Sequence, residues 1–400
     1  MKNSKYILVV NSGSSSIKIA LFKKENNLFQ KIIFSNCQAL NYENCEATLS
    51  DFRTENSSKK TFKLKNYSLS DAIKFFINFL LENNIISNKE EIDKIGHRFV
   101  QGGEIFKSSS EILEKDYHIF EELNPLAPLH NPANFLSYKI FKKELPWSRH
   151  VAVFDTSFHQ TISPERFIYP IPIHFYKKYK IRKYGFHGSS YRYILEKSFN
   201  IFNKKELNLI ICHIGAGSSI VAVEKNKAVN TTMGISPLGG LMMGTRSGDL
   251  DPSVLQFMAQ RENLDIEKVI KILNNQSGLK GVSDFISGDL REILAKKATN
   301  KQANLAWNMF VDRIVDFIGQ YYFQLCGQVD GIVLTAGIGE NSKEFQNLIL
   351  ERINKIINLN IVNKKIDDCL ILAENEKTKF LIIPTNEEIV IAKDTDKILK

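Results

Sequence analysis

Two short polar turns, far apart in the chain, contain the residue types that bind phosphate. The first comprises residues 11–16, Asn-Ser-Gly-Ser-Ser-Ser, and the second comprises residues 213–219, His-Ile-Gly-Ala-Gly-Ser-Ser. Each has a glycine at its third position and a serine at its sixth, and such residues leave backbone N–H groups open to an anion. Two such loops facing each other could bind one polyphosphate from both sides, which points to a nucleotide-using enzyme.

Both turns lie between apolar stretches, so each copy predicts a strand, a tight turn and a second strand (residues 6–10, 17–22, 209–212 and 220–223). Ser14, Ser16 and Lys18 add hydroxyls and a charge at the first turn. Serine-rich hairpin turns also occur without any ligand. A Walker loop is excluded, because the order G-x-x-x-x-G-K-[ST] is absent and a strand follows the turn. The repeated pattern predicts two related halves.

Further charged residues interrupt or end predicted strands, where apolar residues would be expected. His97 and Arg98 interrupt one strand, Asp155 ends another, and His187 and Arg246 lie in glycine-containing segments. Each alone fits a buried structural ion pair equally well. Together they supply what phosphoryl transfer needs, since arginines neutralise phosphoryl oxygens and acidic residues hold Mg²⁺.

A third glycine-containing segment, residues 337–341 (Gly-Ile-Gly-Glu-Asn), lies between a predicted strand and a predicted helix. Backbone N–H groups point outward at such a junction and favour an anion. The segment lacks the third glycine of a dinucleotide-binding fingerprint. Its alternative interpretation is a plain strand-to-helix turn.

The composition predicts an ordinary globular protein of two domains, with 400 residues, 43% hydrophobic and 24% charged. The net charge of +9 comes from scattered lysines near acidic residues, which indicates a solvated surface and no nucleic-acid partner. Five cysteines without C-x-x-C spacing argue against disulfides and zinc. No apolar run is long enough for a signal peptide or a membrane span, so we expect a cytoplasmic protein.

Periodicity predicts the main elements around these motifs. One helix covers residues 70–84 with Ser70 or Asp71 as its cap, and residues 28–66 are strand-rich. The three prolines between residues 123 and 134 predict a rigid loop. Residues 232–252 form a long segment rich in glycine, methionine and serine, and the chemistry of this segment is too specific for a linker. Other predicted elements are strands at 94–100, 150–154, 331–335 and 380–384, and a helix at 305–326.

The motifs taken together resemble acetate kinase, in order and with no large insertion from residue 7 to residue 392. The resemblance implies an α/β fold of two duplicated, actin-like ATPase (ribonuclease H-like) lobes with a nucleotide cleft between them, as in actin, sugar kinases and Hsp70. The lobes would be residues 1–152 with 386–400, and residues 153–385. The matching segments are residues 11–18, 97–98, 127–132, 154–156, 184–188, 243–252, 337–341 and 385–388.

This resemblance implies reversible, in-line phosphoryl transfer between ATP and acetate, with Mg²⁺ (or Mn²⁺) and a homodimeric enzyme. Its catalytic residues would be Asp155, His187 and Arg246, and Asn11 and Glu387 would bind the metal. Acetate would bind to Arg98 in a pocket formed by Val100, Leu129, Phe186 and Pro237. The nucleotide would contact Ser14, Ser16, Lys18, His213, Ile214, Gly215, Ala216, Gly217, Asp289, Leu290, Arg291, Gly337, Ile338, Gly339, Glu340 and Asn341.

A carboxylic acid substrate is already ionised at neutral pH, so it needs no general base. We therefore expect Asp155 to orient Arg98 or a magnesium-bound water. The chain departs from the family pattern at Gln101 and Tyr191, where histidines are usual, and at Ala216, where asparagine is usual. The last change removes a side-chain contact to phosphate worth about 1.5–3 kcal/mol.

Alternatives of two classes remain. One methylene discriminates carboxylates by only about 1–3 kcal/mol, so propionate is the nearest rival substrate. A non-enzymatic nucleotide-binding protein of the actin type would leave Arg98 and Arg246 without a purpose. A kinase weakened into a binding protein is suggested only by the three departures.

Overall fold

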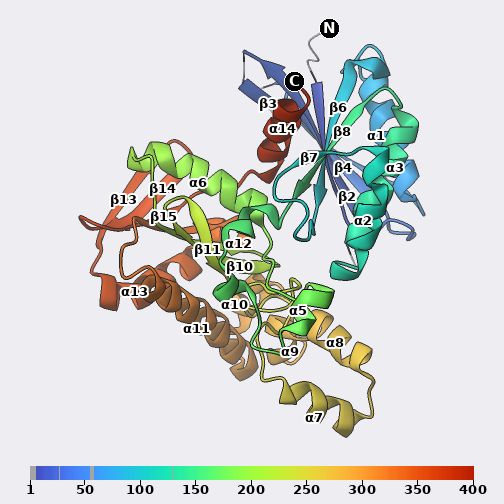
Figure 1. Ribbon diagram of the computed structural model, residues 1–400. Coiled ribbons are helices and arrows are strands. Elements are labelled where there is room, and N and C mark those ends of the chain that lie inside the picture. The colour runs from blue at the N-terminus through green and yellow to red at the C-terminus, as the bar shows by residue number, and fades with distance from the viewer. Residues whose placement is uncertain (1–5, 27, 55–57, 129) are drawn as a thin grey trace. The chain divides into compact units, whose positions relative to one another are not determined.

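The computed structural model describes residues 6–26, 28–54, 58–128 and 130–400. Contacts divide the chain into two compact units, Met1–Ser157 with Asn386–Lys400, and Phe158–Thr385 (Figure 1). We call these unit 1 and unit 2. Asp155 belongs to unit 1 by this division, and the last helix of the chain returns to unit 1.

Unit 1 contains a sheet of eight strands within the described residues, in the order β5-β4-β3-β2-β1-β6-β8-β7. Strand β1 pairs antiparallel with β2 and parallel with β6, and β6 pairs parallel with β8. The carboxyl ends of three parallel strands therefore meet at one edge. The strands are β1 (Tyr6–Ser12), β2 (Ser16–Glu25), β3 (Leu28–Gln38), β4 (Glu46–Asp51), β5 (Ser58–Lys63), β6 (Ile92–Phe99), β7 (Ser110–Glu111) and β8 (Arg149–Phe154).

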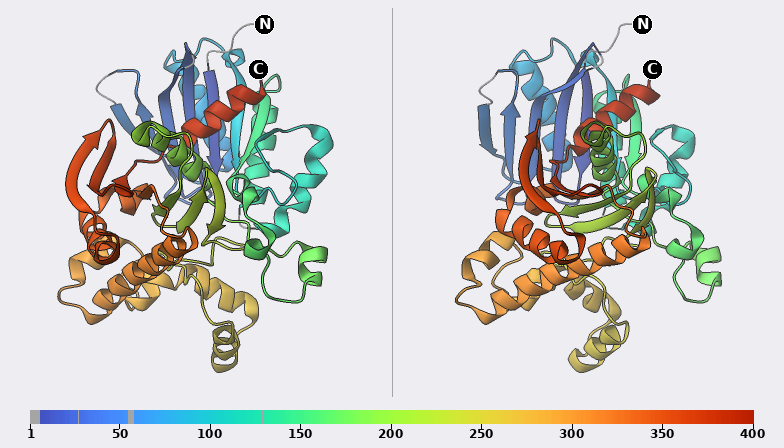
Figure 2. Two further views of the ribbon diagram at one scale, coloured as in Figure 1. Left: turned by 60° about the vertical axis from the view of Figure 1, so that its left-hand side comes forward. Right: turned by 90° about the vertical axis from the view of Figure 1, so that its left-hand side faces the viewer.

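Helices cover both faces of this sheet. Side chains of α1 (Leu69–Glu82) and α3 (Asn131–Glu144) share a core cluster with one face, and those of α14 (Glu387–Ile398) share a cluster with the other. Figure 2 shows α14, in red, against the blue strands in both views. A further short helix is α2 (Tyr117–Glu122).

The cap of α1 differs from the prediction. Ser68, not Ser70 or Asp71, is the N-cap: its hydroxyl accepts from the Asp71 N–H, and the Asp71 carboxylate accepts from the Ser68 N–H. This reciprocal capping box places Asp71 at the third helical position, where it completes the cap rather than being the cap.

Unit 2 repeats the strand arrangement of unit 1. Its described residues form seven strands in the order β11-β10-β9-β12-β15-β14-β13, with β9, β12 and β15 parallel. The run β11-β10-β9-β12-β15-β14 matches β3-β2-β1-β6-β8-β7 in order and in direction. The strands are β9 (Leu209–Ile214), β10 (Ser218–Glu224), β11 (Lys227–Thr231), β12 (Gly331–Thr335), β13 (Asn360–Ile366), β14 (Cys369–Glu374) and β15 (Lys379–Ile382).

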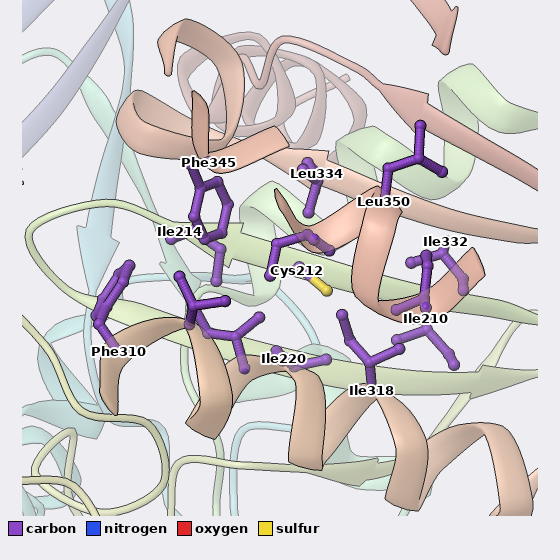
Figure 3. Close-up of a cluster of buried hydrophobic side chains, with 14 of the residues drawn as sticks. Ile210, Cys212, Ile214, Ile220, Phe310, Ile318, Ile332, Leu334, Phe345 and Leu350 are labelled. Carbon is purple, nitrogen blue, oxygen red and sulfur yellow. The ribbon is translucent and has the colours of Figure 1, made fainter. Parts of the chain in front are cut away.

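One amphipathic helix, α11 (Lys301–Gln324), packs along the unit 2 sheet. Its residues Phe310 and Ile318 meet Ile220 of β10 in a cluster that also takes in Phe345 of α13 (Lys343–Ile357) (Figure 3). The other helices of the unit are α4 (Pro164–Phe167), α5 (His174–Tyr179), α6 (Gly188–Phe202), α7 (Ser253–Glu262), α8 (Ile266–Asn275), α9 (Gly278–Val282), α10 (Leu290–Lys296) and α12 (Ala336–Asn341).

Three local predictions need correction. Asn11 and His213 lie inside strands β1 and β9, so both phosphate turns are shorter than expected. Helix α3 begins at Asn131 with Pro132 in its first turn, where a missing N–H costs no hydrogen bond. Residues 337–341 do not form a plain turn but belong to the short helix α12. Among the described residues, no helix combines the length and apolarity needed to cross a bilayer.

Candidate active site

The first cluster of predicted site residues lies at the carboxyl edge of the unit 1 sheet. Asn11 is the second-to-last residue of β1, Arg98 is the second-to-last residue of β6, and Asp155 directly follows β8. Lys18 on β2 is the cross-strand partner of Asn11. Because β1, β6 and β8 are parallel neighbours, their carboxyl ends bring these residues together. Ligands of open α/β sheets commonly bind at this edge.

Arg98 is held in place by Asp155. Its Nε lies 3.0 Å from Oδ1 and its Nη2 lies 2.5 Å from Oδ2, while Nη1 donates to the Asn11 Oδ1 at 3.1 Å. The Asp155 side chain is 1% exposed and that of Arg98 is 21% exposed. Burial alone lowers the pKa of Arg98, but the Asp155 and Glu387 carboxylates outweigh it and raise that pKa. The guanidinium is therefore fixed and charged.

These contacts leave Arg98 with donors for a ligand. A guanidinium has five N–H groups. Asp155 takes the Nε–H and one Nη2–H, and Asn11 takes one Nη1–H. As far as the described residues show, one N–H remains on each terminal nitrogen, and two such donors match the two oxygens of a carboxylate or phosphoryl group.

Glu387 joins this cluster from the first position of α14. Burial raises the pKa of Glu387 to about 7; Arg98 opposes the rise and Asp155 adds to it. A close approach of α14 to the sheet delivers this carboxylate. A Cβ on Gly96 of β6 would lie 2.2 Å from Thr395 Oγ1 and 2.6 Å from Ile391 Cγ2. Only glycine at residue 96 permits that packing.

Two asparagines of α3 connect the first turn to the residues after β6. The Asn134 side chain accepts from the Val100 N–H at 3.2 Å and donates to the Ser12 carbonyl at 2.5 Å. Asn131 makes a reciprocal pair with the Gln101 backbone, at 3.1 and 2.9 Å. Both asparagines are buried. The sequence reasoning missed this positioning role, although two Asn spaced by three residues at a helix start, one before a proline, were a visible signal.

The first turn itself exposes hydroxyls. Ser14 is exposed at its tip, and the Gly13 N–H is used inside the turn by the Ser16 carbonyl, at 2.8 Å. Lys18 is also exposed. A ligand at this turn could therefore contact the exposed side chains of Ser14 and Lys18, whereas the Gly13 N–H is already used within the turn.

A second cluster lies at the equivalent edge of the unit 2 sheet, around two stacked histidines. The rings of His187 and His213 are 4.1 Å apart with an interplanar angle of 18°. His213 Nδ1 lies 2.8 Å from the Ser190 hydroxyl, and His187 Nδ1 lies 2.8 Å from the Ser219 hydroxyl. His187 has left-handed backbone dihedrals, φ 60° and ψ 23°, at the N-cap of α6. Such strained conformations concentrate at functional sites.

Arg246 belongs to the same cluster and carries a charge that lacks a carboxylate partner among the residues with described positions. Its Nη1 donates to the Pro237 carbonyl at 3.2 Å and contacts the Met243 sulfur at 3.7 Å. Burial lowers the pKa of Arg246. Because a partly buried cation without an anion is unfavourable, the site suits an anionic ligand.

Gly217 leaves open the space between these groups. A Cβ there would lie 3.4 Å from Arg246 Nη1 and 3.8 Å from His187 Nε2. A Cβ on Gly215 would lie 3.9 Å from the Gly337 N, so α12 begins beside the same turn. The second turn therefore lies beside His187 and Arg246 at Gly217 and beside the start of α12 at Gly215.

Several predicted nucleotide residues have structural roles. Ile214 and Leu290 are buried in the unit 2 core, so only their backbones could reach a ligand. Asp289 caps α10 and pairs with Arg291 through Nη2 at 2.5 Å. The Glu340 Oε1 accepts from the N–H groups of Ala336 and Thr385, at 2.6 and 2.9 Å.

The remaining predicted residues differ in exposure and in the unit to which they belong. Asn341 and Ala216 are exposed, and Ile338 and Gly339 lie within α12. Of the proposed methyl pocket, Val100 is buried in unit 1 and Phe186 is buried in unit 2, which also contains Pro237. Leu129 lies outside the described residues.

Comparison with known proteins decides the family. The model of the acetokinase family matches residues 6–393. The chain belongs to the acetokinase family. Acetate kinase of Phytoplasma australiense is 43% identical to this family member over 400 residues, covering 98% of each chain.

Two solved structures resemble this acetokinase-family chain equally well. The acetate kinase of Porphyromonas gingivalis aligns with a TM-score of 0.89 at 35% identity, covering 99% of this chain and all of that one. A propionate kinase from Francisella tularensis also aligns at 0.89, with 33% identity and coverage of 98% and 100%. The predicted family and the predicted duplicated α/β fold are both confirmed.

Proposed function

We propose that this acetokinase-family enzyme catalyses reversible transfer of a phosphoryl group between ATP and acetate, giving ADP and acetyl phosphate. The observation that supports it most is the set of contacts that Arg98 makes with Asp155 and Asn11. Within the described part of the chain, these contacts leave one N–H on each terminal nitrogen of the guanidinium. A bound acetate would accept both donors. One of its oxygens would then be positioned to attack the terminal phosphorus atom.

We infer that the unit 2 cluster binds the phosphates. Arg246 and His187 border the space left by Gly217, and their donors suit the oxygens that gain charge during phosphoryl transfer. In unit 1, the hydroxyls of Ser14 and Ser16 and the Lys18 ammonium are the groups suited to phosphate oxygens. Among the departures from the family pattern, Ala216 is exposed and its carbonyl accepts from the Gly244 N–H at 3.4 Å, so a changed side chain leaves that turn intact.

Magnesium fits the donor set around Glu387. Burial raises the pKa of Glu387 to about 7, and a bound cation would stabilise its charged form. No group of three or more His, Cys, Asp or Glu suited to a metal occurs in the described part of the chain. Mg²⁺ commonly uses only one or two protein ligands plus phosphate oxygens and water. We propose Glu387 and Asn11 as these ligands, directly or through water, and the ion would neutralise phosphate charge.

Asp155 acts through Arg98 in this proposal. Acetate is ionised at neutral pH, so abstraction of a proton is not required. The carboxylate fixes the orientation and charge of the guanidinium instead. Propionate is the second candidate substrate, because the propionate kinase structure aligns as well as the acetate kinase structure. A cytoplasmic location and a homodimer are part of the same proposal.

Acyl hydroxamate formation tests this function. Protein, MgATP and hydroxylamine are incubated with acetate, propionate or butyrate, and the hydroxamate is measured. We expect the highest kcat/KM with acetate. Arg98→Ala should remove the activity, whereas Arg149→Ala, a change at an exposed ion pair of the same unit, should not. A higher kcat/KM with propionate would change the substrate, and no product with any acid would refute the kinase function.

A further inference from the structure

Tyr191 of α6 is buried, and a chain of hydrogen bonds connects its hydroxyl to His187 of the second cluster. Its side chain is fully buried, and its ring packs edge-on against His159 at 5.7 Å and against His213 at 6.4 Å. The packing explains why an aromatic ring occupies this position. The hydroxyl makes a separate contact, a short hydrogen bond with Ser219 Oγ.

Ser219 joins the phenol to His187. It is the second residue of β10, is fully buried, and pairs across the strands with His213. Its hydroxyl oxygen lies 2.8 Å from His187 Nδ1 as well as within hydrogen-bond distance of Tyr191. A serine hydroxyl has one proton, so it donates to only one of these neighbours.

The acidity of the two hydroxyls favours one direction for the chain. A phenol has a pKa of about 10 and is a much stronger donor than an alkyl hydroxyl. Tyr191 therefore donates to Ser219, and Ser219 then donates its proton to His187 Nδ1. A neutral imidazole that accepts at Nδ1 carries its proton on Nε2, because the partner of one nitrogen sets the state of the other.

We propose that Tyr191 is a positioning residue that holds His187, through Ser219, as the Nε2–H tautomer. Nε2 is the nitrogen beside the space left by Gly217, which Arg246 also borders. In this tautomer His187 presents a donor to an anion there, and in the other it would present a lone pair. The kinetic consequence rests on the proposed function, but the tautomer is a property of the protein without substrate.

The tyrosine thereby gains a specific role at a position where the family pattern has histidine. Without the phenolic hydroxyl, Ser219 is free to accept a proton from Nδ1, and both tautomers of His187 become accessible. The loss would appear in turnover, where charge develops on the phosphoryl oxygens, more than in binding of the carboxylate, whose proposed site is in unit 1.

Tyr191→Phe tests the proposal because it keeps the ring and removes only the hydroxyl. Tyr193→Phe, two residues along the same helix, is the matched control. In nitrogen-15 spectra of histidine-labelled protein, with the His187 signals assigned from His187→Gln, we expect the Nε2–H form in the wild type and in the control. Tyr191→Phe should show a mixture of tautomers. Its kcat should fall about tenfold, with the KM for acetate changed less than about twofold.

The outcomes separate the two proposals. An Nδ1–H tautomer in the wild type, or an unchanged Nε2–H tautomer in Tyr191→Phe, would overturn the role of Tyr191. A wild type that forms no acyl phosphate but shows the expected tautomers would refute the kinase function alone. If Tyr191→Phe does not fold, the wild-type tautomer and the Ser219→Ala spectrum decide, since that variant should also lose the uniform Nε2–H state.

Discussion

Three buried histidines make the fold sensitive to acid. Burial lowers the pKa of His97 to about 3, of His150 to about 2 and of His159 to about 4. His97 and His150 are linked in unit 1, with Nε2 and Nδ1 2.9 Å apart, and His150 also contacts the Ser148 hydroxyl at 2.8 Å. None of the three can take up a proton near neutral pH without losing this environment.

The sign follows from where the protons bind. An unfolded histidine has a pKa of about 6.5, so below that pH the unfolded chain binds protons that the folded protein does not. Stability is therefore lost as the pH falls below about 6.5, and the loss continues towards the folded pKa values. Between about pH 7.5 and about pH 5.5 each histidine contributes a loss of about 1.4 kcal/mol. The sum for the three is about 4 kcal/mol.

Urea unfolding can measure this separately for each unit. The chain has two tryptophans, Trp147 in unit 1 and Trp307 in unit 2. Fluorescence of a Trp147→Phe variant reports on unit 2, where His159→Gln should reduce the pH-dependent loss of stability by about 1.4 kcal/mol. The exposed His174→Gln serves as the control and should leave the loss unchanged. If Trp147→Phe loses as much stability with falling pH when it also carries His159→Gln as when it does not, the reasoning is refuted.

Three further substitutions test the site. Gly217→Ala would place a methyl group 3.4 Å from Arg246 Nη1, a contact that the fold tolerates. We therefore expect near-normal thermal stability and a kcat at least about tenfold lower. A wild-type kcat would exclude the space beside Gly217 as a phosphate site. Gly96→Ala brings a carbon within 2.2 Å of Thr395 Oγ1 and should lower the free energy of unfolding of unit 1 by about 1–3 kcal/mol. Adding Thr395→Ala should restore part of that stability. A double variant no more stable than Gly96→Ala would contradict the steric cause. Asp155→Asn should lower kcat/KM for acetate by about 100-fold without a new titrating limb in the pH–rate profile, and activity regained simply by raising the pH would show that Asp155 is a base.

The sequence predicted the features that local patterns encode. Two similar strand–turn–strand segments indicated the duplication, and both sheets repeat one strand order. The residues at the ends of parallel strands, Arg98 and Asp155, were recognisable because charged residues interrupt apolar runs. Their pairing follows from the parallel neighbours β6 and β8.

Contacts between distant segments could not be read in the same way. Asn134 contacts Val100 and Ser12, which lie 34 and 122 positions earlier in the chain, and Tyr191 reaches Ser219 across 28 positions. No periodicity links such pairs. The helical state of residues 337–341 was missed for a similar reason, because Glu340 stabilises that turn through the distant Thr385 N–H.

The return of α14 to unit 1 has a consequence for synthesis on the ribosome. Residues up to Ser157 contain all the strands described for unit 1, but not the helix whose Ile391 and Ala392 pack against Ile7, Val9, Val151 and Val153. That apolar face must wait for more than two hundred further residues to be translated. At roughly 5–20 residues per second the delay is about 10–50 seconds. Unit 2 is continuous in sequence but ends at Thr385, directly before α14, so this face of unit 1 stays uncovered while the whole of unit 2 is synthesised.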